Sequence, residues 1–117
     1  MKIRATGHRI PVTAIDKALP FYEGLGFDCS FQSAEWGWAT LEYGDFVLGV
    51  YEPGKGGGLG TPGDGLGFLL WTDDLDGLHG LAKSADLKPG EISESADGKR
   101  LFDISDPFGN MLTFTDS

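Results

Sequence analysis

Hydrophobic positions in this chain follow two spacings, and the order of these spacings repeats. Apolar residues that recur about every 3.6 positions predict one helix over residues 14–23 and another over residues 73–85. The apolar face of the first helix consists of Ile15, Ala18, Leu19 and Tyr22. That of the second consists of Leu75, Leu78, Leu81, Ala82 and Ala85. Because each helix has one apolar face, both are expected to lie against a hydrophobic core.

Short runs of apolar and β-branched residues with a spacing of about two predict strands around both helices. These runs lie at residues 10–12, 27–32, 36–43 and 45–51 in the first half, and at 67–71, 90–93, 100–104 and 111–115 in the second. Each half therefore has the order β-α-β-β-β, and the predicted fold class is α+β. The glycine-rich residues 52–65 indicate a linker between modules at about 1–51 and 66–117 of a single domain, 1–117.

The residues beside each helix predict how it begins and how stable it is. Thr13 precedes the first helix and Asp73 or Asp74 precedes the second, and such side chains accept hydrogen bonds from the amides of a first helical turn. Pro20 falls within the first helix and is expected to kink or shorten it, because proline removes a backbone hydrogen bond. Gly77 and Gly80 weaken the second helix, so both helices depend on tertiary packing.

The acidic balance of the chain limits its partners. With 18 acidic side chains against 9 basic ones, the formal net charge is −9. Such a chain repels polyanions and attracts cations, so nucleic acid is not expected as a partner. A length of 117 residues fits one compact domain with a modest core, and a homodimer would be a natural source of further buried surface.

The number of cysteines and the hydropathy of the chain indicate where in the cell the protein is expected. Cys29 is the only cysteine, so no internal disulfide can form. In its strand-like apolar setting it is expected to be a small buried hydrophobic residue and not a nucleophile, and a reducing, cytoplasmic location is expected. No charged-then-apolar leader and no apolar run of about 18 residues is present, so neither secretion nor a membrane partner is expected.

Three features together point to a known family. They are the repeated β-α-β-β-β order, the stretch 15–22 followed by Leu25-Gly26-Phe27, and the closing Asp106-Pro107-Phe108-Gly109-Asn110. In this combination the chain resembles the glyoxalase/bleomycin resistance/dioxygenase family, also called the vicinal oxygen chelate family. The resemblance implies that the two modules form an incomplete barrel around a cleft, and that the chain is a homodimer.

The resemblance also locates the positions of metal ligands. Metal-using members take one ligand from the first strand and one from the last strand of each module, and their pattern places these positions at Gly7, Gly49, Gly67 and Thr113. Three glycines and one threonine do not make a site for a divalent ion. His8 adjoins one position, but strand alternation turns it to the other face, and His79 is expected on a helix surface. The resemblance therefore implies no metal, no other cofactor and no catalytic residue.

The lining of the cleft follows from the same positions. If the four vacant ligand positions face the cleft, alternation along the strands brings further side chains to that face. The expected ligand-binding residues and their neighbours on this face are Arg9, Pro11, Trp38, Thr40, Val47, Gly49, Tyr51, Leu69, Trp71, Met111, Thr113 and Thr115. Glycine at three of the vacant positions is expected to enlarge the cavity.

Aromatic residues decide which branch of the family the chain resembles. Trp38 matches the aromatic residue on which the metal-free, bleomycin-resistance branch stacks its planar ligand. Gly98 occupies the position of the second stacking residue, so half of that aromatic sandwich is missing. Trp36 is expected to share a face with Trp38, because the two are separated by one residue.

Two members of the lining have alternative roles. Trp71 is explained equally well by packing in the core or at a dimer interface and by contact with the ligand. Arg9 would either bind an anionic group of the ligand or form a structural ion pair with Glu42 or Asp103.

The leading functional hypothesis is a metal-independent small-molecule binding protein that sequesters an antibiotic or another planar aromatic or cationic compound. One alternative is a metal-dependent glyoxalase- or dioxygenase-type enzyme with unusual ligands among His8, Glu42 and Glu52. Another alternative is a non-catalytic dimeric interaction module whose cleft binds nothing.

Overall fold

The computed structural model describes residues 1–2, 7–55, 60–63 and 67–116. Its first unit consists of β1 (His8–Pro11), α1 (Ile15–Gly24), β2 (Asp28–Ser33), β3 (Trp38–Tyr43) and β4 (Phe46–Tyr51). Its second unit consists of β5 (Gly67–Trp71), α2 (Leu75–Ser84), β6 (Ser93–Glu94), β7 (Arg100–Ser105) and β8 (Met111–Thr115). The predicted α+β class and the repeated β-α-β-β-β order are confirmed.

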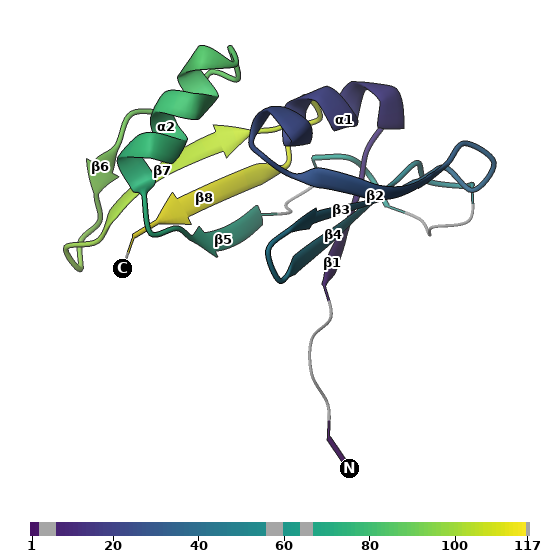
Figure 1. Cartoon of the computed structure of the whole chain (residues 1–117), viewed down its shortest axis with the longest axis horizontal. Coiled ribbons are helices and arrows are strands. Elements are labelled where there is room, and N and C mark those ends of the chain that lie inside the picture. Colours follow the sequence, from purple (N-terminus) through teal and green to yellow (C-terminus); the bar gives the residue numbers. More distant parts are fainter. Residues whose placement is uncertain (3–6, 56–59, 64–66, 117) are drawn as a thin grey trace.

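The described strands form two four-stranded sheets with the same topology. Their orders are β1-β4-β3-β2 and β5-β8-β7-β6. In each sheet the first strand pairs in parallel with the last strand of its module, and the other pairings are antiparallel. Figure 1 shows the two sheets side by side, with α1 beside the first and α2 beside the second. Neither helix in the described ranges is long and apolar enough to cross a membrane.

One hydrophobic core extends through both modules. Alternate side chains of the strands are buried on the helix-covered face, and Ile10, Leu41, Val50, Phe102, Ile104 and Leu112 belong to this cluster. The predicted apolar face of α1 is buried apart from the partly buried Leu19, and Phe21 joins it. The face predicted for α2 is wrong at two positions, because Leu81 is exposed and Ala85 lies beyond the helix end. The side chains of α2 that pack inward are Leu75, Leu78 and Ala82.

The first helix begins differently from the prediction. Its N-cap position is Ala14, which has no side chain to accept a hydrogen bond, so the prediction of Thr13 as the cap is wrong. The backbone amide of Ile15 donates instead to Oε2 of Glu52 at 2.9 Å, and Glu52 directly follows β4. The helix also continues through Pro20 to Gly24, so the expected shortening does not occur.

The second helix begins as predicted. Its cap is Asp74, whose Oδ1 accepts a hydrogen bond from the amide of Gly77 at 2.9 Å. This contact is local in sequence, because cap and amide are three residues apart. An Asp that directly precedes an apolar helix can therefore be predicted as its cap from the sequence. The cap that Glu52 supplies to α1 cannot, because Glu52 is distant from the helix along the chain.

The strand predicted at residues 90–93 is the least accurate element. Strand β6 covers only Ser93 and Glu94. The preceding residues Asp86 and Lys88 have φ values of 57° and 56°, and Pro89 has no amide to donate to a ladder. Gly90 still contacts the neighbouring strand through a hydrogen bond from its amide to the carbonyl of Asp103 at 2.8 Å. Residues 86–92 therefore form a loop that contacts β7, and β6 begins only at Ser93.

A buried polar cluster joins the two modules, and the closing motif of the chain supplies most of it. The hydroxyl of Tyr22 in α1 donates to Oδ2 of Asp106 at 2.8 Å. The amide nitrogen Nδ2 of Asn110 donates to the same oxygen at 2.8 Å and to the carbonyl of Pro11 at 3.2 Å. The other oxygen of Asp106 accepts from the backbone amides of Phe108 at 2.9 Å and Asn110 at 2.8 Å. Burial, and next the charge of Asp106, raises the pKa of Tyr22 above its ordinary value of 10.0, so the hydroxyl remains a donor.

Replacing Glu52 by Gln should lower the free energy of unfolding by about 0.5–1 kcal/mol at neutral pH. The Lys55 ammonium, which lies 2.6 Å from Oε1, and next the amide of Ile15 lower the pKa of Glu52 below its ordinary value of 4.5. A carboxylate with a lowered pKa stabilises the fold above its unfolded-state pKa and loses that contribution as the pH falls through the folded-state pKa. Urea unfolding of the two proteins should therefore converge in acid, below pH 4.5.

The matched control for this experiment is Glu35→Gln, because Glu35 is an exposed acidic residue in the turn between β2 and β3. The control should leave stability within about 0.5 kcal/mol of the wild type at neutral pH. Parallel stability curves for wild type and Glu52→Gln across the acid range would contradict the assigned role of Glu52.

Candidate functional site

An aromatic platform lies on the face of the first sheet that points away from α1. Strand register pairs Arg9 with Gly49 and Thr40 with Gly49, and it pairs Tyr51 with both Pro11 and Trp38. Their neighbours Ile10, Ala39 and Val50 are buried on the opposite, helix-covered face. We use the name platform for Arg9, Trp38, Thr40, Gly49 and Tyr51. Pro11 and Val47 lie on the same face as the platform. All the first-module residues expected to line the cleft therefore share one face of the sheet.

Trp38 is held flat within the platform by three neighbours. Its ring stacks on that of Tyr51, with a centroid separation of 6.4 Å and an interplanar angle of 18°. Its Nε1 donates to Oγ1 of Thr40 at 2.8 Å. The indole also covers Gly49, where an added Cβ would lie 2.5 Å from Cη2 of Trp38. Because its donor is satisfied and its ring is supported, the indole presents a rigid apolar face.

The expectation that glycines at the vacant positions enlarge a cavity is wrong at two of the three. The space at Gly49 is filled by the indole of Trp38. At Gly7 an added Cβ would lie 2.5 Å from the carbonyl oxygen of Val47, so the backbone of β4 occupies that space. Only at Gly67 would a Cβ make ordinary contacts, with Met111 at 3.6 Å as the nearest residue. Two of these glycines therefore allow close packing instead of opening a cavity.

Arg9 places a positive charge beside the aromatic rings. Its Cζ lies 5.6 Å from the centroid of the Tyr51 ring, in the range of a cation–π contact worth about 0.5–1 kcal/mol at exposed sites. Tyr51 is only 6% exposed. Asp103, one of the two ion-pair partners considered for Arg9, accepts a hydrogen bond from Oγ1 of Thr113 at 2.5 Å. The platform therefore combines flat apolar rings with one guanidinium.

The second-module residues of the expected lining form a separate exposed strip. Register pairs Leu69 with Thr113, Gly67 with Met111 and Trp71 with Thr115. The neighbours Leu112 and Phe114 are buried on the helix-covered face. Leu69 is 84% exposed and Met111 is 41% exposed, while Trp71 is 66% exposed. We call Leu69, Trp71 and Met111 the exposed strip; large apolar side chains that gather on one face mark an interaction surface.

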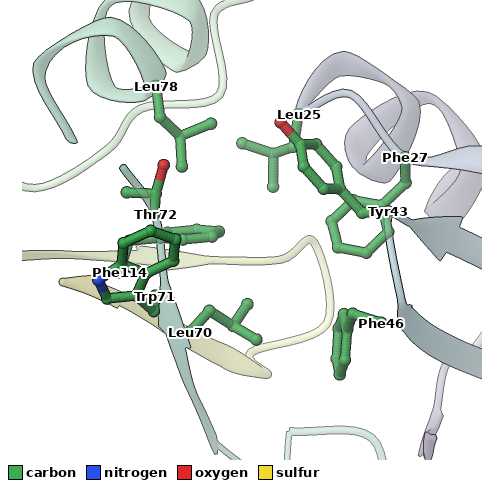
Figure 2. Close-up of a pocket in the computed structure, with 9 residues that line it drawn as sticks. All are labelled: Leu25, Phe27, Tyr43, Phe46, Leu70, Trp71, Thr72, Leu78 and Phe114. Atoms are coloured by element: carbon green, nitrogen blue, oxygen red, sulfur yellow. The ribbon is translucent and has the colours of Figure 1, made fainter. Parts of the chain in front are cut away.

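Two of the hollows between the modules are lined by residues that the sequence predicted for the cleft. Arg9 and Leu69 line a groove of about 380 Å³. Its other lining residues are His8, Phe46, Gly67, Phe68 and Leu70. Trp71 lines a different cavity of about 110 Å³, drawn in Figure 2. The groove therefore brings Arg9 of the platform next to Leu69 of the exposed strip, whereas Trp71 of the same strip lines the other cavity.

Both histidines have packing roles. The ring of His8 lies 5.8 Å from that of Phe46 and 5.4 Å from that of Phe68, away from the platform face, as alternation predicts. Nε2 of His79 lies 2.8 Å from the carbonyl oxygen of Gly90, and its ring packs against Phe102. Within the ranges that the structure describes, no three His, Cys, Asp or Glu side chains gather closely enough to hold a metal ion.

Local geometry explains two departures from the expected aromatic pattern. Gly98 has a φ of 82° in the turn where the amide of Ser95 donates to the carbonyl of Lys99, and an L side chain is strained there. A stacking ring at this position would therefore be costly. Trp36 lies in a turn before β3 and is exposed, so the parity argument that grouped it with Trp38 does not apply.

Comparison with solved structures identifies the fold. A crystal structure of a bleomycin-binding protein complexed with bleomycin is similar over 99% of this chain and 99% of the other, with a TM-score of 0.80 and 24% identity. A bleomycin resistance determinant encoded on the transposon Tn5 is similar over 98% of both chains, with a TM-score of 0.81 and 24% identity. A lactoylglutathione lyase from Agrobacterium tumefaciens gives a TM-score of 0.78 and 15% identity, over 97% of this chain and 93% of the other.

The chain therefore has the fold of the glyoxalase/bleomycin resistance/dioxygenase superfamily, the vicinal oxygen chelate fold, as its sequence motifs predicted. Sequence comparisons add nothing to this result, because no family model and no curated protein sequence matches the chain. At sequence identities of 15–24%, the similarity shows the fold alone. That fold is shared by binding proteins and by a lyase. The role of the chain must be argued from its own side chains.

Proposed function

We propose that this protein binds a small planar organic molecule without a metal or cofactor and releases it unchanged. The observation that carries the proposal is the rigid indole of Trp38, supported by Tyr51 and Gly49 and fixed by Thr40. The half-buried indole lies on a sheet face that neither helix covers, and a flat ring stacks on another flat ring. The similar fold of a bleomycin-binding protein supports sequestration of an antibiotic or another aromatic compound.

The charge of the chain favours a cationic ligand at long range. The net charge of −9 attracts cations to the molecule as a whole. Close to the platform, Arg9 would repel a cation placed over Tyr51 but would pair with an anionic substituent. We therefore propose a ligand with a planar aromatic part over Trp38, whose positive groups lie away from Arg9. The missing aromatic residue at Gly98 argues against the two-sided grip that the resemblance implies for bleomycin itself.

We further propose that two copies form a homodimer through the exposed strip of each chain. Leu69, Trp71 and Met111 expose apolar area that a single chain leaves in water. A cytoplasmic location remains an expectation that rests on the single Cys29. Sedimentation of the purified protein at the mass of one chain would reject the dimer.

Replacing Trp38 by Ala should weaken binding of proflavine, a planar cationic dye, roughly tenfold, because the stacking and cation–π contributions are lost together. Fluorescence titration measures the dissociation constant, and chromatography of the recovered dye shows whether it is unchanged. Trp36→Ala is the matched control, since Trp36 lies in an exposed turn outside the platform. Equal affinities of wild type and Trp38→Ala would remove Trp38 from the site, and a chemical product would reject simple sequestration.

The same exposed strip supports a second candidate, an interaction module whose cleft binds nothing. A thermal-shift screen of planar cationic and anionic compounds separates the two, because a ligand that binds only the folded state raises its melting temperature. A dimer that no compound stabilises would favour the interaction module.

A further inference from the structure

The cavity between the two modules has walls from both halves of the chain. Figure 2 shows Leu25, Phe27, Tyr43 and Phe46 of the first module on one side of the space, and Leu70, Trp71, Thr72, Leu78 and Phe114 of the second on the other. Phe46 and Leu70 also line the groove that holds Arg9 and Leu69. The cavity and the groove are therefore neighbours, but no residue of the platform lines the cavity.

The lining of this cavity is almost entirely hydrocarbon. Leu25, Phe27 and Phe114 are buried members of the core. Tyr43, which is 53% exposed, and Trp71 stand on opposite walls where the cavity meets solvent. The rings of Tyr43 and Phe27 meet edge to face at 5.5 Å, which keeps the Tyr43 ring in the wall. The cavity is thus an apolar space at the edge of the core, open to solvent at an aromatic rim.

Few polar groups are available to hold water in this space. Oγ1 of Thr72 already accepts a hydrogen bond from the amide of Asp74 at 3.2 Å. The other polar atoms of the lining side chains are the Tyr43 hydroxyl and the Trp71 indole nitrogen, both on exposed rim residues. An ordered water needs about two to four polar partners, so the interior of the cavity favours an apolar occupant over water.

The size of the cavity selects the occupant. Its volume is about 110 Å³. Engineered apolar cavities of about 150 Å³ lined by Leu, Ile and Phe bind benzene. The space between the modules is therefore suited to a single six-membered ring and is too small for the several fused rings of a drug-sized ligand.

We infer that this cavity is a second ligand site, which binds one small uncharged aromatic molecule of a single ring between the two modules. The site is independent of the platform, because its lining includes none of Arg9, Trp38, Thr40, Gly49 or Tyr51. A bound ring would contact Phe27 and Phe46 on one wall and Phe114 and Trp71 on the other. Its occupation would stabilise the packing of one module on the other, since both supply the walls.

Thermal unfolding in the presence of benzene tests the inference. At about ten times its dissociation constant, benzene should raise the melting temperature by on the order of 5 °C. Benzoate should give no shift, because its carboxylate would lose hydration without a partner. Benzene should also change the emission of Trp71 in a variant that keeps it as the single tryptophan, with Trp36 and Trp38 replaced by Phe.

Leu78→Trp provides the decisive variant, because the larger side chain on α2 fills the cavity. Leu81→Trp is the matched control, since Leu81 lies on the same helix but is exposed and does not line the cavity. We expect the benzene shift to vanish in Leu78→Trp and to persist in Leu81→Trp and in Trp38→Ala. Melting temperatures without benzene show whether each variant is folded. If Leu78→Trp does not fold, Leu78→Phe is the smaller enlargement of the same side chain, and the benzene shift should be lost in it as well.

Each outcome decides between sites. A benzene shift that is lost in Trp38→Ala and kept in Leu78→Trp would place the ring on the platform and overturn the inference. Absence of any benzene shift in the wild type would overturn it as well. Neither result affects the proflavine experiment, which reports on the platform alone, so the second site and the proposed function succeed or fail separately.

Discussion

Asp106→Ala is expected to lower the free energy of unfolding by about 3–5 kcal/mol. The carboxylate is 4% exposed and accepts hydrogen bonds from Tyr22, from the side chain of Asn110 and from the amides of Phe108 and Asn110. Removing it leaves several buried donors without their acceptor and releases the contact between α1 and the turn before β8. Denaturation in urea, followed by circular dichroism, measures the loss.

Two further variants show whether the loss comes from the cluster. Tyr22→Phe removes one donor and should cost about 1–2 kcal/mol, because a single hydrogen bond to a charged group is lost. Asp103→Ala should cost less than about 1 kcal/mol, since Asp103 is exposed and its carboxylate accepts a hydrogen bond from the hydroxyl of Thr113. If Asp106→Ala is no less stable than Asp103→Ala, the cluster does not hold the modules together.

Gly49→Ala should displace the indole of Trp38 and so disturb both stability and binding. The new Cβ would lie 2.5 Å from Cη2 of Trp38, which is closer than packed carbon atoms approach, so the ring must move. Movement breaks the hydrogen bond from Nε1 to Thr40 and the stacking on Tyr51. We expect a loss of about 1–3 kcal/mol in unfolding free energy, as for other overpacked sites. Proflavine binding should weaken to the level of Trp38→Ala.

Gly67→Ala is the matched control for this change. Gly67 is another of the predicted vacant ligand positions, on the first strand of the second module, but an added Cβ there meets Met111 only at 3.6 Å. The control should unfold within about 0.5–1 kcal/mol of the wild type and retain proflavine binding. Near-ultraviolet circular dichroism reports the orientation of Trp38. An unchanged spectrum and affinity in Gly49→Ala would show that Gly49 does not position the indole.

The periodicity of the chain was sufficient to predict which face of each strand is buried. Ile10, Leu41 and Val50 point to the core, and Arg9, Thr40 and Gly49 point away from it, as alternation requires. This inference succeeds because successive side chains of a strand take opposite faces whatever the strand pairs with. The order of helices and strands follows for the same local reason.

The same reasoning failed where a contact joins residues that are distant along the chain. Thr13 was the cap that local sequence favours, yet Glu52 caps the helix because the end of β4 lies beside the start of α1. The sequence predicts open space at Gly49, but Trp38 from the paired strand fills it. Parity gives no sign that Trp71 also lines the cavity between the modules, because the first module supplies the opposite wall. None of these contacts can be predicted from the residues that surround either partner in the sequence.

The amino-acid sequence alone determined the two modules, the side chains available on each face, and the absence of ligand-bearing residues at Gly7, Gly49 and Gly67. These properties depend on residue type and on spacings within one element. Only the tertiary structure decided which of the exposed side chains meet, because strand register and the packing of one module against the other set those distances. The platform and the cavity between the modules both arise at that level.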